Sequence, residues 1–416
     1  MREGWEEVRI EDVLTKIIGG GTPSKSNPMY WNGNIPWCSV KDMADDKFLL
    51  FGTEDRITNI GLENSSANLI PKGTIVIATR MGLGRAFITG CDMAINQDLK
   101  ALIPNSKVDN KFLLWLIIAN RKRLNDLGTG STVKGIKLEI LKAIKINLPP
   151  LTTQRKIASI LSAYDDLIEN NTRRIKLLEE KAQLTYEEWF VRMKFPGHES
   201  TPINQETGLP DGWERKKIES LLEVSSSKRI FLTDYVDYGI PFYRGKEIIL
   251  KSKNESLNDR LFISPEKYSK IKSQYGIPKK GDLLVTAVGT LGYPYLVTES
   301  DGDFYFKDGN LIWFKGNDNI SSIYLISCFK DARFKANLSN IAIGSSQKAL
   351  TIKSLKGLNI LNPSKRVSDE YDSIIKPIFD LIENLQNNIQ LLKEARDILL
   401  PRLMSGMIDV DSLDIQ

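Results

Sequence analysis

The sequence predicts an α+β protein in which one architecture occurs twice: a globular domain of mixed strand and helix, followed by one long helix. Two observations support this fold class. The motif GWEEVRIEDVL, which begins at Gly4, returns as GWERKKIESLL at Gly212. A heptad pattern of apolar residues then closes each half of the chain, which predicts that the two long helices pair as an antiparallel coiled coil. The length of 416 residues agrees, because a single hydrophobic core seldom grows that large.

The two globular domains are expected over residues 1–150 and 212–365. In each, the GW motif is followed by an IP segment, IPWCSVKDM or IPFYRGKEI, and then by a strand pair punctuated by glycines, PKGTIVIATRMGLGRAFI or PKKGDLLVTAVGTLGYPYLV. The halves realign at Gly130 and Gly344, where GSTVKGIKLEILKAIKINLP matches GSSQKALTIKSLKGLNILNP at an offset of 214 residues. The shared order of segments predicts two copies of one domain.

The segment INLPPL at the end of the first domain raises the question of a catalytic loop. DNA amino-methyltransferases hold a flipped base with an Asn/Asp-Pro-Pro-aromatic motif, but here Leu148 separates Asn147 from the prolines, and Leu151 stands where the aromatic ring should be. Pro149 aligns with Pro363 of the second copy, which has no proline pair. A strand that ends before a helix explains these prolines without catalysis.

A long helix is expected after each of these prolines, over residues 151–193 and in the C-terminal segment 366–416. Apolar residues recur there in alternating steps of four and three, which predicts a coiled-coil seam, with a one-sided core helix as the alternative. At 1.5 Å per residue, about 40 residues make a rod of roughly 60 Å, suited to a spacer or a docking post. The expected seam positions are Ile157, Leu161, Ile168, Asn171, Ile175, Leu178, Ile375, Ile378, Ile382, Leu385, Ile389 and Leu392.

Two residues depart from this helix pattern. Asn171 is polar on the expected seam, which can set the register of a coiled coil at a cost in stability. Pro377 lies inside the second helix and predicts a kink or a late start. Between the first helix and the second domain, residues 194–211 are rich in Pro and Gly and lack periodicity, which predicts a linker.

Basic residues are in slight excess and unevenly distributed. The net charge of +5 permits nucleic-acid binding without requiring it. Residues 121–145 hold seven Lys and Arg against only Asp126 and Glu139. This segment is a candidate phosphate-facing surface, and a solvated charged face is the alternative.

Motifs for binding nucleotides are incomplete. GGGTPSKS at residues 19–26 approaches a Walker A loop, but Ser24 replaces the last glycine and Pro23 removes a backbone donor. GLGRAF, which begins at Gly82, lacks the third glycine of a dinucleotide-binding loop and does not open a helix. Both segments are better interpreted as glycine-rich turns.

Candidates for acid-base catalysis and metal binding are scarce. The single histidine, His198, falls in the expected linker. Cys38, Cys91 and Cys328 form neither a CxxC pair nor a disulfide framework, which predicts a reduced, cytoplasmic setting. The longest apolar run, FLLWLII, is far shorter than the ~20 residues of a membrane span. We therefore expect no catalytic residue, no metal site, no cofactor bound by this chain and no membrane contact.

Several of these segments together resemble the specificity subunit of type I restriction-modification enzymes. The shared signatures are GW at the start of each half, the GST or GSS segment that leads to a strand, LPPLTTQRKIASIL feeding a helix with DDLIENN, and ILLPRLMSG near the end. They cover essentially the whole chain twice. The family commonly has Glu-Gln after PPL, whereas this chain has Thr153-Gln154.

The resemblance implies a non-catalytic subunit that binds double-stranded DNA. Each globular domain would be a target recognition domain that reads one half of a bipartite sequence, and the helices would set the spacing and dock two methyltransferase subunits. Those partners would bind S-adenosylmethionine, and restriction/translocase subunits would use ATP and magnesium. A coiled-coil adaptor without sequence-specific DNA binding is the alternative, but it does not need two globular domains.

Candidate DNA contacts are polar or basic residues in the segments that the repeat shares. The residues flank the glycine turn of the first domain, follow IPFY in the second, or align between the GST and GSS segments, where hydroxyl and ammonium groups suit phosphate. Turn capping and solvated charge are their alternative roles. The candidates are Arg80, Arg85, Ser131, Thr132, Lys134, Arg244, Lys246, Ser345, Ser346 and Lys348.

Overall fold

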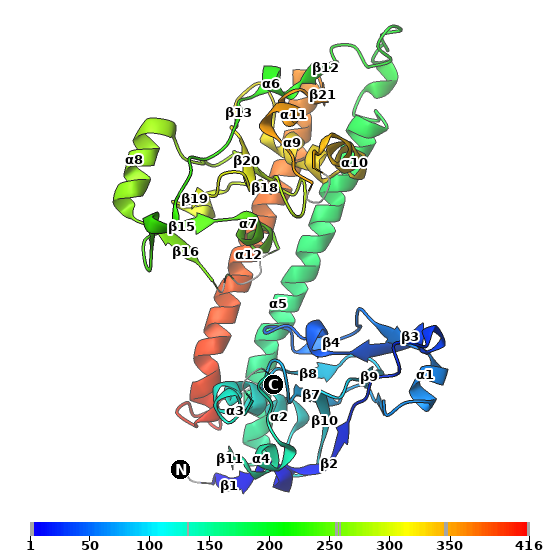
Figure 1. The fold of residues 1–416 in the computed structure, drawn as a ribbon, viewed down its shortest axis with the longest axis vertical. Helices are drawn as coiled ribbons and strands as arrows, with labels where there is room; N and C mark the ends of the chain where they lie inside the picture. The colour runs from blue at the N-terminus through cyan, green and yellow to red at the C-terminus, as the bar shows by residue number, and fades with distance from the viewer. Residues whose placement is uncertain (1–3, 131–132, 254–256, 258, 345–347, 414–416) are drawn as a thin grey trace. The chain divides into compact units, whose positions relative to one another are not determined.

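The structure is a computed structural model of the whole chain, and it describes residues 4–130, 133–253, 257, 259–344 and 348–413 (Figure 1). The chain forms two compact units. The first unit comprises residues 1–171 and 388–416, and the second comprises residues 172–387. Each unit therefore contains one globular domain and a part of each long helix.

The first globular domain is built from short strands with helices between them. Its sheets follow the orders β2-β10-β7-β8-β4, β5-β3-β9-β6 and β1-β11. The strands are β1 (Glu6–Arg9), β2 (Leu14–Gly19), β3 (Trp31–Cys38), β4 (Leu49–Leu50), β5 (Arg56–Ile57), β6 (Leu69–Ile70), β7 (Ile75–Ala78), β8 (Ala86–Thr89), β9 (Met93–Ile95), β10 (Leu99–Pro104) and β11 (Lys145–Leu148). The helices are α1 (Asn59–Glu63), α2 (Asn110–Ala119), α3 (Arg121–Asp126) and α4 (Leu138–Ala143).

The core of this domain lies between its largest sheet and α2. Strand β7 reads IVIA and is buried along its whole length, as expected for a central strand covered on both faces. Helix α2 buries Phe112 to Ile117 in the same hydrophobic cluster as Ile75 and Ile77 of β7. Strand β1 pairs antiparallel with β11, so the first and last strands of the domain lie side by side.

The second globular domain repeats this plan. Its sheets follow the orders β13-β20-β17-β18, β14-β16-β15-β19 and β12-β21. The strands are β12 (Glu214–Lys217), β13 (Val224–Ser225), β14 (Tyr235–Val236), β15 (Ile240–Tyr243), β16 (Leu261–Ile263), β17 (Leu283–Thr286), β18 (Pro294–Leu296), β19 (Tyr305–Phe306), β20 (Leu311–Phe314) and β21 (Asn359–Asn362). The helices are α6 (Ile218–Leu221), α7 (Gly245–Ser252), α8 (Pro265–Tyr275), α9 (Ser322–Lys330), α10 (Ala332–Ile341) and α11 (Ile352–Lys356). The pair β12 and β21 repeats the pairing of β1 and β11.

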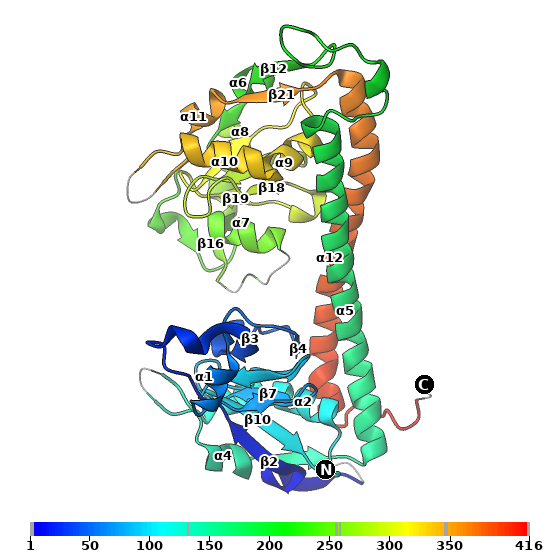
Figure 2. The same ribbon diagram turned by 90° about the vertical axis from the view of Figure 1, so that its right-hand side faces the viewer.

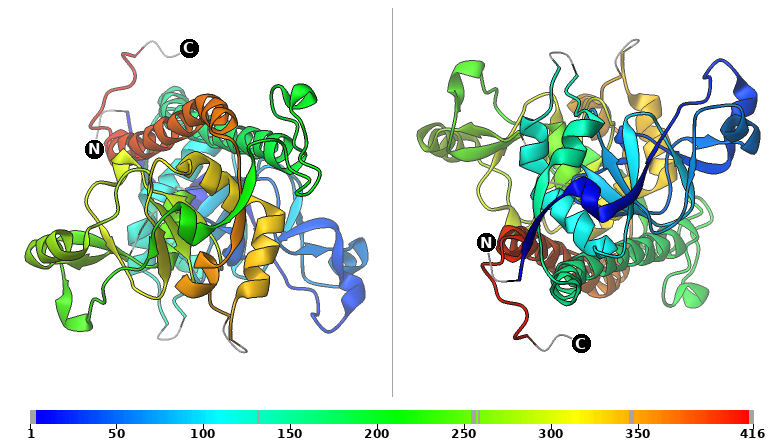
Figure 3. Two further views of the ribbon diagram at one scale, coloured as in Figure 1. Left: turned by 90° about the horizontal axis from the view of Figure 1, so that it is seen from above. Right: turned by 90° about the horizontal axis from the view of Figure 1, so that it is seen from below.

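The long helices are α5 (Leu151–Tyr186), which continues into a π-helical turn (Glu187–Val191), and α12 (Lys365–Met404). Pro149 and Pro150 lie between β11 and α5, where the sequence places the end of a strand before a helix. Within each unit the two helices lie side by side at one flank of the globular domain (Figures 2 and 3).

The two helices pair in antiparallel fashion, as predicted. In the first unit, Ile157 near the start of α5 shares a hydrophobic cluster with Leu403 near the end of α12. In the second unit, Tyr186 at the end of α5 shares a cluster with Tyr371 near the start of α12. None of the twelve expected seam residues is exposed, and nine, Asn171 among them, are buried.

Helix α12 begins at Lys365 and runs through Pro377, so the expected late start is wrong, while the kink stays a prediction. The side chain of Pro377 is exposed. On this face water can take the place of the hydrogen bond that the missing N–H would have made, which lowers the cost of an internal proline.

Residues 194–211 connect the first long helix to the second domain. They contain a short 3₁₀ turn (His198–Ser200) and a single bridge between Ile203 and Pro210. Phe195 and Leu209 are buried in the core of the second unit, so this segment packs against the domain. None of the described helices combines the length and the apolar character of a membrane span.

Candidate nucleic-acid interface

The first candidate surface is built on the turn between β7 and β8. The two strands pair antiparallel, and the Gly84 N–H donates to the Ala78 carbonyl oxygen at 3.3 Å, which closes the turn. Gly82 and Gly84 adopt positive φ angles of 116° and 78°, which glycine tolerates because it has no Cβ. Met81 has a positive φ of 53° as well.

The segment that contains Lys134 lies beside this turn. The Met81 N–H donates to the Lys134 carbonyl oxygen at 3.4 Å, and Gly135 forms an antiparallel bridge with Arg80. The structure thus brings the predicted DNA contacts Arg80 and Lys134 together, although they are distant in sequence. Both side chains are exposed, and Arg80 also lies 3.5 Å from an Asp98 carboxylate oxygen. Ser131 and Thr132, predicted in the same segment, lie outside the described residues.

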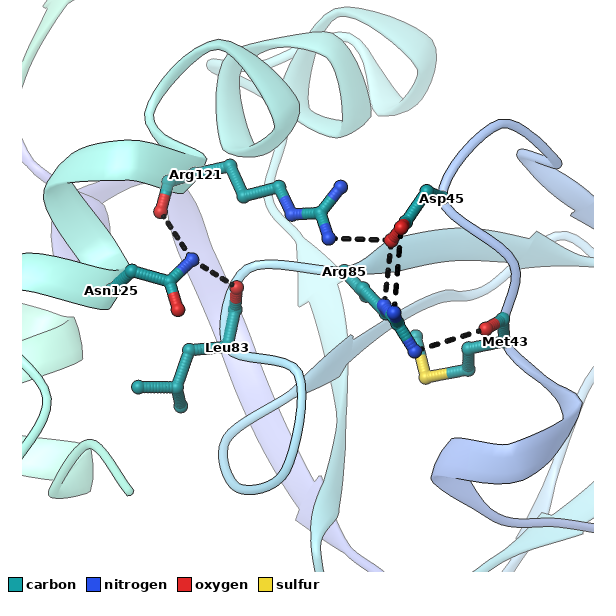
Figure 4. Close-up of polar contacts among 6 residues, drawn as sticks. All are labelled: Met43, Asp45, Leu83, Arg85, Arg121 and Asn125. Atoms are coloured by element: carbon teal, nitrogen blue, oxygen red, sulfur yellow. Dashed lines mark hydrogen bonds and ion pairs between the residues drawn. The ribbon is translucent and has the colours of Figure 1, made fainter. Parts of the chain in front are cut away.

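Arg85 faces inward from the same turn. Its Nε lies 2.7 Å from Asp45 Oδ1, its Nη1 donates to the Met43 carbonyl oxygen at 3.3 Å, and Arg121 binds the same carboxylate (Figure 4). Burial raises the pKa of Asp45, but the hydrogen bonds and charges of Arg121 and Arg85 outweigh burial and hold this pKa below its usual value. These contacts give Arg85 a role in fixing the turn, while its predicted contact with DNA stays a prediction.

Asn125 of α3 holds the turn from the other side. Its Nδ2 donates to the carbonyl oxygens of Leu83 at 2.9 Å and Arg121 at 3.0 Å (Figure 4). The turn is therefore anchored both to the segment that carries Asp45 and to a helix.

The segment that carries Asp45 is itself attached to α12. Lys393 Nζ lies 2.6 Å from Asp46 Oδ2, and the guanidinium carbon of Arg396 lies 4.9 Å from the centre of the Phe48 ring. All of these residues belong to the first unit. A continuous set of contacts thus joins α12 to the turn between β7 and β8.

The second domain has an equivalent turn between β17 and β18. The Gly292 N–H donates to the Thr286 carbonyl oxygen at 2.8 Å, the same bond that Gly84 makes in the first domain. This equivalence places Gly289, with a φ of 71°, where the first domain has Met81. Tyr293 replaces Arg85, and its hydroxyl accepts a hydrogen bond from Ser252 Oγ of α7 at 2.9 Å. The same backbone turn is thus anchored by different side chains.

Lys348 lies beside this second turn. The residue is exposed, and its neighbour Ala349 forms bridges with Val288 and Ile343. The arrangement matches that of Lys134 in the first domain. Ser345 and Ser346 lie outside the described residues.

Arg244 and Lys246 lie at the start of α7, away from the second turn in the sequence. Arg244 Nε donates to Glu247 Oε2 at 3.1 Å, and its backbone N–H donates to the same oxygen at 2.9 Å. Burial raises the pKa of Glu247, but hydrogen bonds from Arg244 outweigh it and hold this pKa below its usual value. Arg244 thus occupies the N-cap position of α7, where the Glu247 carboxylate holds its backbone N–H and its guanidinium, while Lys246 is exposed.

These two residues line an open cleft with three polar residues that sequence reasoning missed, Asp259, Arg260 and Asn310. Arg260 and Asn310 lie outside the sequence segments that the repeats share, so the comparison of the repeats gives no signal for them. In the fold Asn310 takes the place of Asp98, because its carbonyl oxygen accepts from the Ala287 N–H at 2.8 Å as that of Asp98 accepts from the Thr79 N–H at 2.8 Å. The residues that line the cleft are Arg244, Lys246, Asp259, Arg260, Leu261 and Asn310. Among the residues that the structure describes, no cluster of three or more His, Cys, Asp or Glu could hold a metal ion.

Comparisons with known proteins agree on one family. The model of the type I restriction modification DNA specificity domain matches residues 2–180 and 210–395. The MjaIX specificity subunit of Methanocaldococcus jannaschii is 28% identical over 98% of this chain and 94% of its own length. The HindI specificity subunit of Haemophilus influenzae is 23% identical over 97% of this chain and 99% of its own. A crystal structure of the S subunit of a type I restriction-modification system from M. genitalium has a similar fold, with a TM-score of 0.56, 15% identity and 96% of both chains covered.

Proposed function

The chain belongs to the family of type I restriction modification DNA specificity domains, which it matches twice, and we propose that it selects the DNA target of a type I restriction-modification complex. The observation that carries this proposal is the duplication of the turn. Each domain presents a turn closed by the same backbone hydrogen bond, with an exposed lysine, Lys134 or Lys348, in the segment beside it. Two equivalent surfaces suit a target in two parts.

We propose that each domain reads one half of the target independently. The equivalent turns expose different residues, Met81 in the first domain and Gly289 in the second. They are also anchored differently, by Arg85 and Asp45 or by Tyr293 and Ser252. A conserved backbone that carries different side chains is a means to read two different sequences with one fold.

Basic residues at these turns would fix the position of each domain on the duplex. Arg80, Lys134 and Lys348 are exposed cations on or beside the turns. Contacts of this kind reach phosphate oxygens and add affinity without sequence information, whereas contacts with base edges specify the sequence.

We propose that the long helices dock two methyltransferase subunits. Helix α5 exposes Leu177 and Leu184, and α12 exposes Leu391 and Ile398, each more than half exposed. The second pair follows the first at the same offset of 214 residues that relates the seams. Residues seven apart lie on one helix face, so Leu177 and Leu184 form an apolar stripe on α5, and Leu391 and Ile398 form one on α12, where a partner could bind.

We propose that the reactions of the complex are catalysed by its other subunits. We expect S-adenosylmethionine on the methyltransferase subunits, and ATP and magnesium on restriction/translocase subunits, with this chain acting as a non-catalytic subunit. A cytoplasmic location is part of the proposal and is consistent with the free thiols of Cys38, Cys91 and Cys328.

The proposal is tested by assembling the chain with its cognate methyltransferase subunits and offering a DNA library with random sequence. Sequencing of the methylated molecules should give one bipartite target, and the chain alone should transfer no methyl group. Methylation that is independent of sequence would instead support the coiled-coil adaptor, and methyl transfer by the chain alone would refute the non-catalytic assignment.

A further inference from the structure

The turn between β7 and β8 holds one residue in an unfavourable backbone conformation. Met81 has a φ of 53°, a region that L residues avoid because Cβ approaches the following carbonyl oxygen. The equivalent residue of the second domain is Gly289, with a φ of 71° and no Cβ. The fold therefore accepts glycine at this position, yet the first domain has a long side chain there.

Packing does not account for the side chain of Met81. Met193 also has a positive φ, 57°, but it is partly buried and packs against the core of the second unit. Met81 is 58% exposed and belongs to none of the hydrophobic clusters of the described residues. An exposed residue that keeps a strained conformation without a gain in packing points to a functional use of its side chain.

The surroundings of Met81 indicate what it would bind. The turn is anchored on both sides of its tip, by Arg85 to Asp45 and by Asn125 to the Leu83 carbonyl oxygen (Figure 4). Two cations flank the tip, because Arg80 precedes Met81 and the Met81 N–H binds the Lys134 carbonyl oxygen. A polarisable apolar group between cations fits the edge of a DNA groove, where phosphates border the bases.

We propose that Met81 is a specificity-determining residue whose side chain contacts the 5-methyl group of a thymine in the half-site of the first domain. The thymine methyl is the one apolar group that the bases offer in the major groove, and apolar side chains recognise it by contact. This proposal rests on the proposed function and names the base that one domain reads.

The test compares wild-type chain and Met81→Ala, each assembled with methyltransferase subunits, on targets in which single thymines are replaced by deoxyuracil. The replacement removes only the methyl group. For the wild type, methylation efficiency should fall by about four-fold at one position of the first half-site, the value of one buried methyl group. Met81→Ala should lose a similar factor on the thymine target and should not respond to deoxyuracil at that position.

Two further variants complete the test. Met81→Gly introduces the glycine that the second domain has at this position. The variant should therefore have a higher midpoint of thermal unfolding than the wild type and should lose the thymine preference. Met29→Ala is the matched control, because Met29 is 66% exposed in the same domain, and it should keep the wild-type response to deoxyuracil.

Two results would overturn the assignment of Met81: an unchanged deoxyuracil response in Met81→Ala, or loss of the same response in Met29→Ala. A wild-type complex without any sequence preference would overturn the proposed function itself, so the two failures are distinguishable.

Discussion

Arg396 Nη1 lies 2.7 Å from Asp165 Oδ1, and this ion pair joins α12 to α5 within the first unit. The guanidinium of Arg396 is almost completely buried and lies over the rings of Phe48 and Trp115, at 4.9 Å and 5.8 Å from their centres. A charge in the helix seam is thus paired with a carboxylate and covered by aromatic rings of the globular domain. The contact holds the domain, α5 and α12 together at one point.

Removal of Arg396 should destabilise the first unit. Arg396→Met leaves the partly buried carboxylate of Asp165 without its partner, which should lower the free energy of unfolding by about 3 kcal/mol, near the lower end for broken buried pairs. Urea denaturation measures this change. Arg402→Met, on the exposed side of the same helix, should change it by less than about 0.5 kcal/mol. Equal effects of both variants would mean that the pair contributes nothing specific.

The ion pair should also give an unusual pH dependence. Burial raises the pKa of Asp165 from its usual 3.8 to about 6, although the charge of Arg396 lowers it in part. The folded chain therefore holds this proton more tightly than the unfolded chain, so the contribution of Asp165 to stability is largest below pH 4 and is lost as the pH rises towards 6.

Asp165→Asn isolates this contribution, because carboxylates with lowered pKa, such as Asp45 and Glu247, act in the opposite direction in both proteins. The stability of the wild type relative to Asp165→Asn should fall by on the order of 2 kcal/mol between pH 4 and pH 7. Urea denaturation at several pH values measures the difference. A wild-type advantage that grows with pH would show that Arg396 outweighs burial.

Loss of the Asp45 carboxylate should affect recognition more than stability. Asp45 is 46% exposed, so Asp45→Ala should cost about 1 kcal/mol of unfolding free energy or less. The turn would lose its anchor through Arg85, and ordering it on DNA should lower methylation at the target by about two- to ten-fold. The base preferences of the second half-site should persist. Asp126→Ala changes an exposed aspartate of the same domain and serves as the control. If both variants methylate the target equally well, the contact of Arg85 with Asp45 does not contribute to recognition.

Lys134 and Lys348 should contribute equally to DNA affinity. If each ammonium contacts one phosphate, Lys134→Ala or Lys348→Ala should weaken binding to matched and mismatched DNA alike. Each should reduce the slope of log affinity against log salt concentration by about 0.9. Equilibrium binding of the assembled complex over a salt series measures this slope. Lys111→Ala on α2 is the control, and a slope that does not change in the two variants would leave these lysines as solvated charges.

The sequence predicted the features that depend on periodicity or repetition. Seam residues such as Ile157 and Ile389 are buried as expected, because the heptad pattern records which helix face is covered. The sequence did not predict which side chains pair. Arg85 binds Asp45, which lies on a distant segment, and the second domain does not repeat this ion pair, because Tyr293 takes the place of Arg85. The sequence did not predict the cleft residues Asn310 and Arg260 for the same reason, because residues that differ between the two copies give no repeat signal.

The apolar stripes on the two helices lead to the last prediction. Leu177 and Leu184 on α5 correspond to Leu391 and Ile398 on α12, and all four side chains are more than half exposed, so charged substitutions there should cost little folding energy. If each stripe docks one methyltransferase subunit, Leu177→Glu with Leu184→Glu should remove one copy from the complex. Leu391→Glu with Ile398→Glu should remove the other, and all four changes together should remove both.

Native mass spectrometry of the assembled complex counts these subunits directly. Lys176→Glu changes an exposed charge of α5 away from the stripe and should leave the count unchanged, which separates a local apolar contact from a general effect of charge. Buried leucines at an interface lose their transfer free energy when replaced by a carboxylate, and the carboxylate must also be desolvated, so even a partial contact should be disrupted. If both double variants retain every methyltransferase subunit, the partners bind elsewhere, and the long helices act only to hold the domains to one another.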